Sequence, residues 1–243
     1  MFTLFKKEVQ GFLNSLIGYI VMIVFLVMIG LFLWVFPLEF NILDNGFANL
    51  DGLFILAPFI FLFLIPSITM RSFADEKKSG TLELLMTQPL TDIRVIMAKF
   101  LAGVILVIFS LVPTLVYYFS VYKLGLPQGN LDSGSIWGSY IGLIFLGACF
   151  VSIGVFASSL TDNQIVSFIL AVFISFFVYM GFEFIYTFIL SGKAGLIVES
   201  LGLNAHYSSM SRGVIDTRDV IYFISVTGLF ILLTKLSLES RKW

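Results

Sequence analysis

The stretch LIGYIVMIVFLVMIGLFLWVF, residues 16–36, decides the fold class because it contains no charged side chain. An apolar helix needs about 20 residues to cross a bilayer core about 30 Å thick. The run is longer than the core of a signal peptide, and no small-residue cleavage pattern follows it. We therefore interpret residues 16–36 as a retained first membrane span.

The composition of the whole chain agrees with a membrane environment. Hydrophobic residues make up 59% of the 243 positions and charged residues only 12%, with a mean hydropathy of +1.03. Soluble domains lie far from these values. The formal net charge is -1 and no dense basic tract is present, which argues against a nucleic-acid partner. The single cysteine, Cys149, lies in an apolar run, and we expect it to be a packing residue.

Five further apolar runs follow the first one. The predicted spans cover residues 16–36, 52–70, 100–122, 136–160, 165–190 and 220–236. The runs are continuously apolar, whereas the strands of a membrane barrel would alternate over about ten residues. The sequence therefore predicts an all-α integral membrane protein, with one transmembrane domain over residues 1–243.

Residues 1–15 have a different pattern. Large apolar side chains recur there at spacings of three and four, and polar side chains occupy the other faces: Phe2, Phe5, Val9, Phe12 and Leu16 against Lys6, Lys7, Gln10 and Asn14. This pattern is typical of an amphipathic helix at the membrane interface. The alternative is a frayed start of the first span.

The distribution of Lys and Arg predicts the orientation. With the N-terminus in the cytoplasm, the cytoplasmic side receives most of the cations: Lys6, Lys7, Arg71, Lys77, Lys78, Arg94, Lys99, Arg241 and Lys242. Only Lys123, Lys193, Arg212 and Arg218 then lie outside. Both termini are expected in the cytoplasm, and residues 191–219 form an external segment.

The longest predicted cytoplasmic segment is RSFADEKKSGTLELLMTQPLTDIRVIMAK, residues 71–99. Ser79 and Gly80 interrupt it, residues 81–87 can form a short helix that ends at Pro89, and Thr91 can cap the next helix. Two short helices separated by a turn would form a rigid projection suited to docking on a soluble partner. An ordinary solvated connector is equally consistent with this spacing.

Three polar positions elsewhere are candidates. Asp162 or Asn163 can cap the fifth span in a short turn. Glu183 is the one acid well inside an apolar run. It is either a residue at the membrane boundary that faces water or the helix bundle, or part of an ion or substrate relay. His206, the single histidine, lies in a stretch that predicts an amphipathic external helix leading into the last span, and one imidazole does not make a metal site.

No Gly-rich phosphate-binding loop ending in Gly-Lys-Ser/Thr occurs in the chain. We therefore expect this chain to bind no nucleotide itself and to lack ATPase activity. No metal or cofactor site is expected in it either. If ATP drives the protein, the ATPase is a separate subunit.

Residues 71–99 resemble the signature of ABC-2-type permeases. The matching residues are Arg71, the run Ala74, Asp75 and Glu76, the run Ser79, Gly80, Thr81, Leu82, Glu83, Leu84 and Leu85, and then Pro89 and Lys99. The stretches FASSLTDNQIVS, residues 156–167, and SRGVIDTRDVIYFISVT, residues 211–227, are also similar to small six-span members. Within the family, the chain looks closest to the gliding-motility-associated branch.

The resemblance implies a permease of the type V exporter kind in a bacterial inner membrane. By this analogy residues 71–99 couple the helices to a separate ATPase subunit that binds ATP and Mg²⁺. The main coupling element is the segment from Asp75 to Leu85, and the turn from Thr161 to Gln164, which includes Asp162, is a smaller contact. A second permease subunit, identical or homologous, is also implied.

Three other classes of function are alternatives. A stand-alone secondary transporter would need paired ionisable groups inside the spans, and only Glu183 is available. A membrane scaffold would need no such groups. An intramembrane enzyme would need a nucleophile and a base within the spans, and the sequence shows no such pair.

Overall fold

The computed structural model describes residues 1–243 except 45, 87–90, 190–194, 196–197 and 241–243. Within the described residues, six helical segments are long and apolar enough to cross a membrane: Leu16–Trp34, Asp51–Lys78, Asp92–Leu124, Ser133–Leu160, Gln164–Thr187 and Thr217–Glu239. The predicted all-α fold with six spans is confirmed, and the chain is a multi-pass membrane protein.

The helices are not all continuous. They are α1 (Phe2–Leu13), α2 (Leu16–Trp34), α3 (Asp51–Thr69), α4 (Ala74–Lys78), α5 (Thr81–Met86), α6 (Asp92–Leu111), α7 (Leu115–Leu124), α8 (Ser133–Leu160), α9 (Gln164–Phe176), α10 (Phe182–Ile189), α12 (Leu203–Met210) and α13 (Thr217–Glu239). A 3₁₀ turn containing Pro113 separates α6 from α7, because proline cannot donate the helical hydrogen bond. A π-helical turn, Phe177–Gly181, separates α9 from α10.

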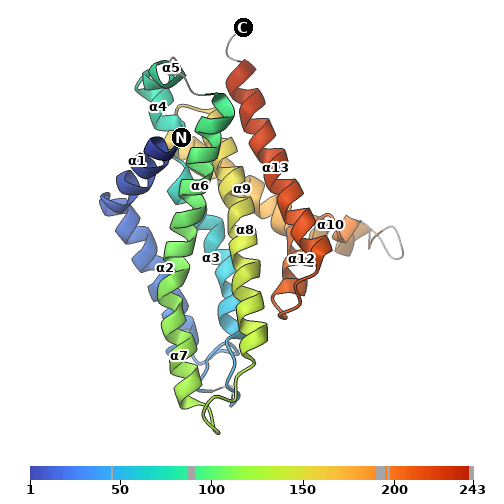
Figure 1. The fold of residues 1–243 in the computed structure, drawn as a ribbon. Helices are drawn as coiled ribbons and strands as arrows, with labels where there is room; N and C mark the ends of the chain where they lie inside the picture. Colours follow the sequence, from blue (N-terminus) through green and yellow to red (C-terminus); the bar gives the residue numbers. More distant parts are fainter. Residues whose placement is uncertain (45, 87–90, 190–194, 196–197, 241–243) are drawn as a thin grey trace.

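Helix α8 forms the centre of the bundle, with contacts to α3, α6, α9, α12 and α13 (Figure 1). It is the most deeply buried of the six spans, whereas α2, α9 and α13 keep large apolar side chains exposed. Helix α1 packs against α6 and α2 at the same end of the bundle as α4 and α5 (Figure 1). We call this end the platform end.

Glycines allow α8 to approach its neighbours closely. A Cβ atom built on Gly154 would overlap Oγ1 of Thr69 in α3, and one on Gly138 would lie 2.8 Å from the Cα of Gly213. Neither position is open to a real side chain, so any other residue would push the backbones apart. These two glycines therefore allow α8 to pack closely on α3 and on the turn at Gly213.

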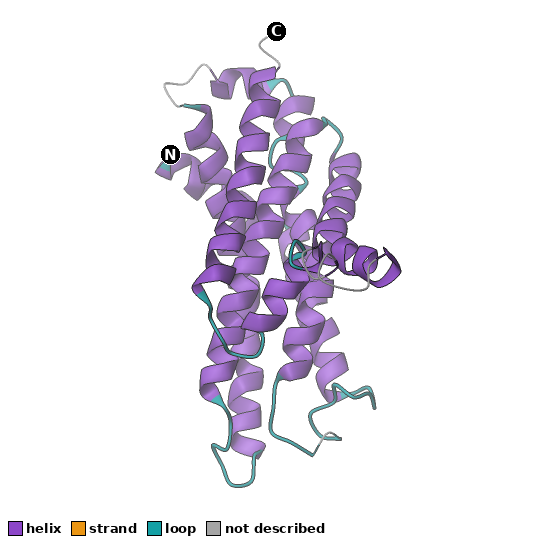
Figure 2. Ribbon diagram, turned by 90° about the vertical axis from the view of Figure 1, so that its right-hand side faces the viewer, coloured by secondary structure: helices purple, strands orange, loops and turns teal. Residues whose placement is uncertain are grey.

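The short helices α10 and α12 lie beside the middle of the bundle, while α7 and the start of α8 extend well past them (Figures 1 and 2). Tyr207 in α12 is buried and donates a hydrogen bond of 2.6 Å to the carbonyl of Phe54 in α3. Pro58, four residues after Phe54, has no N–H to bond that carbonyl. Tyr207 therefore supplies the donor that the proline removes.

One predicted element is wrong. The stretch around His206 is not one helix leading into the last span, because α12 ends at Met210 and α13 begins only at Thr217. Gly213 adopts a φ of +83° in the intervening turn, and the side chain of Asp216 then caps α13 by accepting from the N–H of Arg218 at 3.0 Å.

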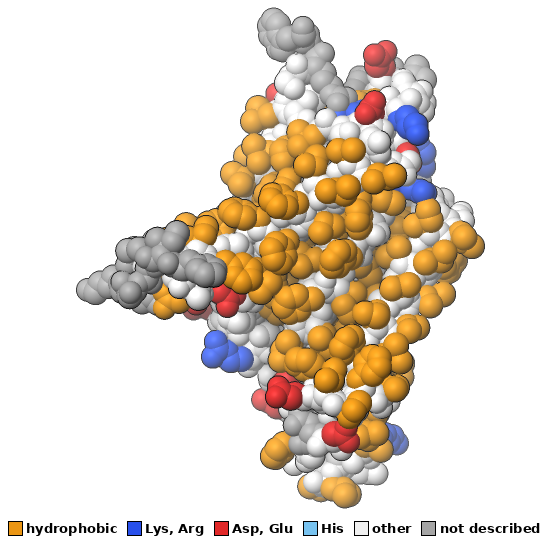
Figure 3. Space-filling view, turned by 180° about the vertical axis from the view of Figure 1, so that it is seen from behind, with side chains coloured by type: hydrophobic (Ala, Val, Ile, Leu, Met, Phe, Trp, Pro, Cys, Tyr) orange, Lys and Arg blue, Asp and Glu red, His pale blue; other side chains and the backbone are white. Residues whose placement is uncertain are grey.

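The surface has the pattern of a membrane protein. Figure 3 shows a broad band of hydrophobic side chains between two ends that carry Lys, Arg, Asp and Glu. The helix α6 is longer than its apolar part because its first turns contain Asp92, Arg94 and Lys99. Charged side chains therefore continue from the platform end into the start of the third span.

Candidate functional site

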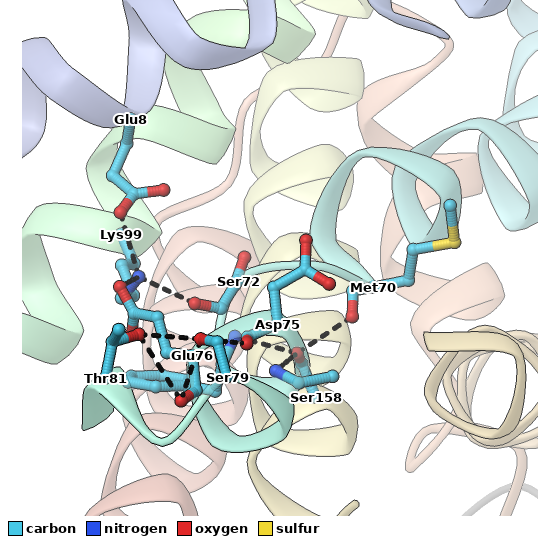
Figure 4. Close-up of polar contacts among 11 residues, drawn as sticks. Glu8, Met70, Ser72, Asp75, Glu76, Ser79, Thr81, Lys99 and Ser158 are labelled. Atoms are coloured by element: carbon cyan, nitrogen blue, oxygen red, sulfur yellow. Dashed lines mark hydrogen bonds and ion pairs between the residues drawn. The ribbon is translucent and has the colours of Figure 1, made fainter. Parts of the chain in front are cut away.

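The candidate site is the α4–α5 hairpin at the platform end (Figure 1). Helix α4 carries Asp75 and Glu76 in its first turn, where carboxylates oppose the positive end of the helix dipole. Gly80 separates α4 from α5 and has a φ of +70°, a left-handed conformation that favours glycine. The hydroxyl of Ser79 lies 2.8 Å from that of Thr81 and links the two helices across this turn (Figure 4).

A buried serine of α8 holds the start of α4. The hydroxyl of Ser158 accepts hydrogen bonds from the N–H groups of Phe73 (2.9 Å) and Ala74 (3.0 Å), and donates to the carbonyl of Met70 (3.0 Å). Met70 and Phe73 lie in the bend between α3 and α4, and Ala74 is the first residue of α4. Figure 4 shows Ser158 beside Met70. The side chain of Ser158 is fully buried, so it replaces the water that would otherwise satisfy these backbone groups.

A buried lysine of α6 forms the second attachment. The ammonium group of Lys99 donates to Glu8 in α1 (2.8 Å), to Glu76 in α4 (2.9 Å) and to the carbonyl of Ser72 (2.6 Å) (Figure 4). Its three N–H groups are all used, and its side chain is only 1% exposed. Lys99 also lies 5.0 Å from the ring centroid of Phe73. One cation therefore joins three elements.

The start of α9 supplies the third attachment. The side-chain amide of Gln164 accepts from Nε of Arg71 at 3.2 Å and donates to a carboxylate oxygen of Asp75. The ammonium group of Lys77 donates to the carbonyl of Ser159 at the end of α8. Helix α4 is therefore fixed to the short turn between α8 and α9, although almost ninety residues separate them in the sequence.

The predicted site residues divide into two groups. Asp75 and Glu76 are half-buried and bond neighbouring helices, and Arg71 is exposed but also bonds Gln164 in α9. Gly80, Thr81 and Glu83 are exposed on the hairpin and form the outward group. Asp162 is also exposed, in the turn before α9. Pro89 and the side chain of Leu84 lie outside the described residues. The inward group positions the hairpin, and the outward group is the part that a partner can contact.

The polar positions outside the hairpin have local partners. Asn163, not Asp162, caps α9, with its side chain accepting from the N–H of Ile165 at 2.9 Å. Glu183 is exposed and accepts a hydrogen bond of 2.7 Å from Asn204 in α12. His206 lies 2.7 Å from Asp219 in α13 and stacks on Tyr222.

Sequence reasoning did not find the residues that hold the hairpin. Glu8 and Ser158 have no role in the sequence analysis, and Gln164 enters it only as part of the turn that begins at Thr161, because the partners of these residues are distant in the sequence. The available signals are the resemblance of residues 71–99, which includes Lys99, and that of residues 156–167, which includes Ser158 and Gln164. A lysine beside a predicted apolar span also needs a partner.

The fold and the site together define a multi-pass helical membrane protein with a charged helical hairpin fixed to one end of its bundle. The sequence profile of the ABC-2 family transporter proteins matches residues 2–233, nearly the whole chain. The chain therefore belongs to the ABC-2 family and is a membrane permease component of an ABC transporter, not its ATPase. A search of curated proteins found none that matches it.

Proposed function

We propose that this chain is the membrane half of an ATP-driven exporter or mechanotransmitter, and that its separate ATPase subunit docks on the α4–α5 hairpin. ATP and Mg²⁺ bind to that partner. The observation that carries the proposal is the fixation of α4 to α1, α6, α8 and α9 through Ser158, Lys99 and Gln164. A force applied to the hairpin is transmitted to these helices, because hydrogen bonds and ion pairs hold α4 in a fixed position relative to them.

The exposed side of the hairpin supports docking. Thr81 and Glu83 on α5 and Lys78 at the end of α4 are exposed, while Leu82 is buried beneath them. Leu82 thus anchors α5, and its polar neighbours are available to a partner. Asp162 lies in the nearby α8–α9 turn and would form the smaller contact.

The orientation in the membrane is part of the proposal. The platform end carries most of the described cations: Lys6, Lys7, Arg71, Lys77, Lys78, Arg94, Lys99 and Lys235. Lys and Arg are enriched in cytoplasmic loops. We therefore assign the platform end and both termini to the cytoplasmic face of a bacterial inner membrane.

A reversal of charge on the hairpin tests the docking. Glu83→Lys should lower recovery of the ATPase subunit with the tagged permease by about fivefold, the effect of roughly 1 kcal/mol at an exposed ion pair. Gly80→Pro should lower it as well, because proline cannot adopt a φ of +70°. The matched control is Asp44→Lys, an exposed acid in the loop between α2 and α3.

Both hairpin variants should still be inserted in the membrane at normal levels. Unchanged recovery of the ATPase and unchanged ATP hydrolysis in both variants would contradict the proposal. A loss that Asp44→Lys shares would show that the assay reports general damage.

The finer assignment has two parts. We propose a complex with a second permease subunit, identical or homologous, which would cover part of the apolar surface left exposed on α2, α9 and α13. We also propose that the transporter acts in gliding motility, on the sequence resemblance of residues 71–99, 156–167 and 211–227. Deletion of the gene should abolish surface spreading without slowing growth, and normal spreading would contradict this part.

A further inference from the structure

A pocket of about 320 Å³ lies between α1, the start of α2, the end of α3, α4 and α6. This volume is at the lower end for small-molecule sites, which suits a lipid headgroup better than a whole lipid. Apolar side chains form the part of the pocket nearer the membrane spans, including Ile17, Ala102 and Leu106. The polar part is formed by Lys7, Glu8, Arg71, Asp75, Glu76 and Lys99.

The charges of the pocket balance. Three cationic and three carboxylate side chains line it, so the pocket as a whole offers no net attraction to an anion. The charges are unevenly placed, however. The buried Lys99 faces two carboxylates, Glu8 and Glu76, which leaves an excess of one negative charge on the inner wall. Lys7 and Arg71 are exposed and supply the positive charge.

The inner wall, around Lys99, offers carboxylate acceptors, whereas the three N–H groups of Lys99 are already used. The second carboxylate oxygen of Glu76 is buried and has no hydrogen-bond partner within the described residues. An unsatisfied buried acceptor is costly, and the terminal torsion of a glutamate is soft enough to turn toward a donor. Glu8 is 24% exposed and accepts only from Lys99 in the described part of the chain. A ligand that suits this wall must donate hydrogen bonds.

We propose that this pocket binds the phosphoethanolamine headgroup of a phospholipid from the leaflet on the platform side. The primary ammonium donates to Glu8 and Glu76, and the phosphate lies near Lys7 and Arg71. A choline headgroup has the same charges but no N–H to donate, so it fits the wall poorly. A phosphatidylglycerol headgroup has no cation for the carboxylates. The acyl chains extend along the apolar part of the pocket into the membrane.

The test is lipid retention by the purified full chain in mild detergent, measured by native mass spectrometry with equal amounts of phosphatidylethanolamine, phosphatidylcholine and phosphatidylglycerol. One phosphatidylethanolamine should be retained about tenfold better than the other two, the discrimination of one charge-assisted hydrogen bond. Soluble glycerophosphoethanolamine, offered separately, should bind far more weakly because it has no acyl chains.

Three variants sharpen the test. Glu8→Gln should remove the preference for ethanolamine over choline. Gly11→Leu should lower retention of phosphatidylethanolamine by filling the pocket, since Gly11 lines it and no atom lies within 4 Å of the position that a Cβ would occupy there. Glu39→Gln is the matched control, an exposed glutamate that does not line the pocket, and it should change nothing.

Equal retention of the three lipids, or a preference for phosphatidylglycerol, would overturn the proposal. An unchanged preference in both Glu8→Gln and Gly11→Leu would overturn it as well. Binding of glycerophosphoethanolamine as strong as that of the lipid would show that the ligand is a soluble molecule. None of these outcomes depends on an ATPase partner, so this proposal and the docking proposal can fail separately.

Discussion

Replacement of Ser158 by alanine removes the hydroxyl that joins α8 to the bend before α4. The N–H groups of Phe73 and Ala74 then lose their acceptor, and the carbonyl of Met70 loses a donor. The site is fully buried, so water reaches these groups only if the bend opens. The change is small in volume and leaves the packing of α8 nearly as it is.

The expected magnitude follows from the groups left without partners. A buried unsatisfied donor or acceptor costs about 1–3 kcal/mol, and partial opening of the bend to water sets the lower end of that range. The free energy of local opening should therefore fall by about 1–3 kcal/mol. Amide hydrogen exchange at Phe73 and Ala74 should become roughly 5–150-fold faster.

The assay is hydrogen exchange with mass spectrometry on the full chain in lipid nanodiscs, with peptides that cover the bend and α4. The matched control is Ser152→Ala, also buried in α8, whose hydroxyl bonds, among the described residues, only the carbonyl of Cys149 in its own helix. Equal protection of the bend in the two variants would refute the reasoning. It would show that packing alone holds α4 in place.

Three further variants test the surrounding structure. Lys99→Met should lower the melting temperature in detergent strongly, because about 3 kcal/mol is lost when buried carboxylates lose their cation. Adding Glu8→Gln and Glu76→Gln should restore part of the lost melting temperature, and no restoration would contradict the role of the ion cluster. Gly80→Ala should cost about 1 kcal/mol at the hairpin, seen as faster exchange in α5, because its φ is +70°; unchanged exchange would contradict this. Gly154→Ala should destabilise the protein by about 1–3 kcal/mol in thermal unfolding, whereas the control Gly228→Ala, which has open space around it, should not. Equal losses of stability in the two variants would refute the close α3–α8 packing.

The sequence predicts those features that depend on residues close together in the chain. The apolar run of residues 16–36 and its five counterparts suffice for six spans, because the bilayer fixes the length that a helix needs. The turn at Gly80 is predicted because a glycine after a serine interrupts a helix, and Asn163 is one of the two neighbouring residues predicted to cap α9. Each of these depends on at most a few neighbours.

The attachments of the hairpin depend on tertiary structure instead. Lys99 and Glu8 are 91 positions apart, and Ser158 and Phe73 are 85 apart. No periodicity in one sequence reports which helices become neighbours, so these pairs could not be predicted. The error around His206 has a similar origin, since the turn at Gly213 forms where α12 folds back against α8 and α13.

The positions of the attachments bear on how the hairpin could act. Ser158 and Gln164 flank the turn between α8 and α9, and Lys99 lies at the start of the third span. The same end of α8 that holds α4 also contacts α13, where Ser237 donates to the carbonyl of Ser159. A displacement of α4 therefore reaches α13 through the end of α8, whereas α1, α6 and α9 are joined to α4 directly by the contacts of Lys99 and Gln164. Ser158→Ala should uncouple ATP hydrolysis from transport while the ATPase still docks, whereas Glu83→Lys should weaken docking itself about fivefold. Measurement of complex recovery and of transport on the same preparations separates the two defects.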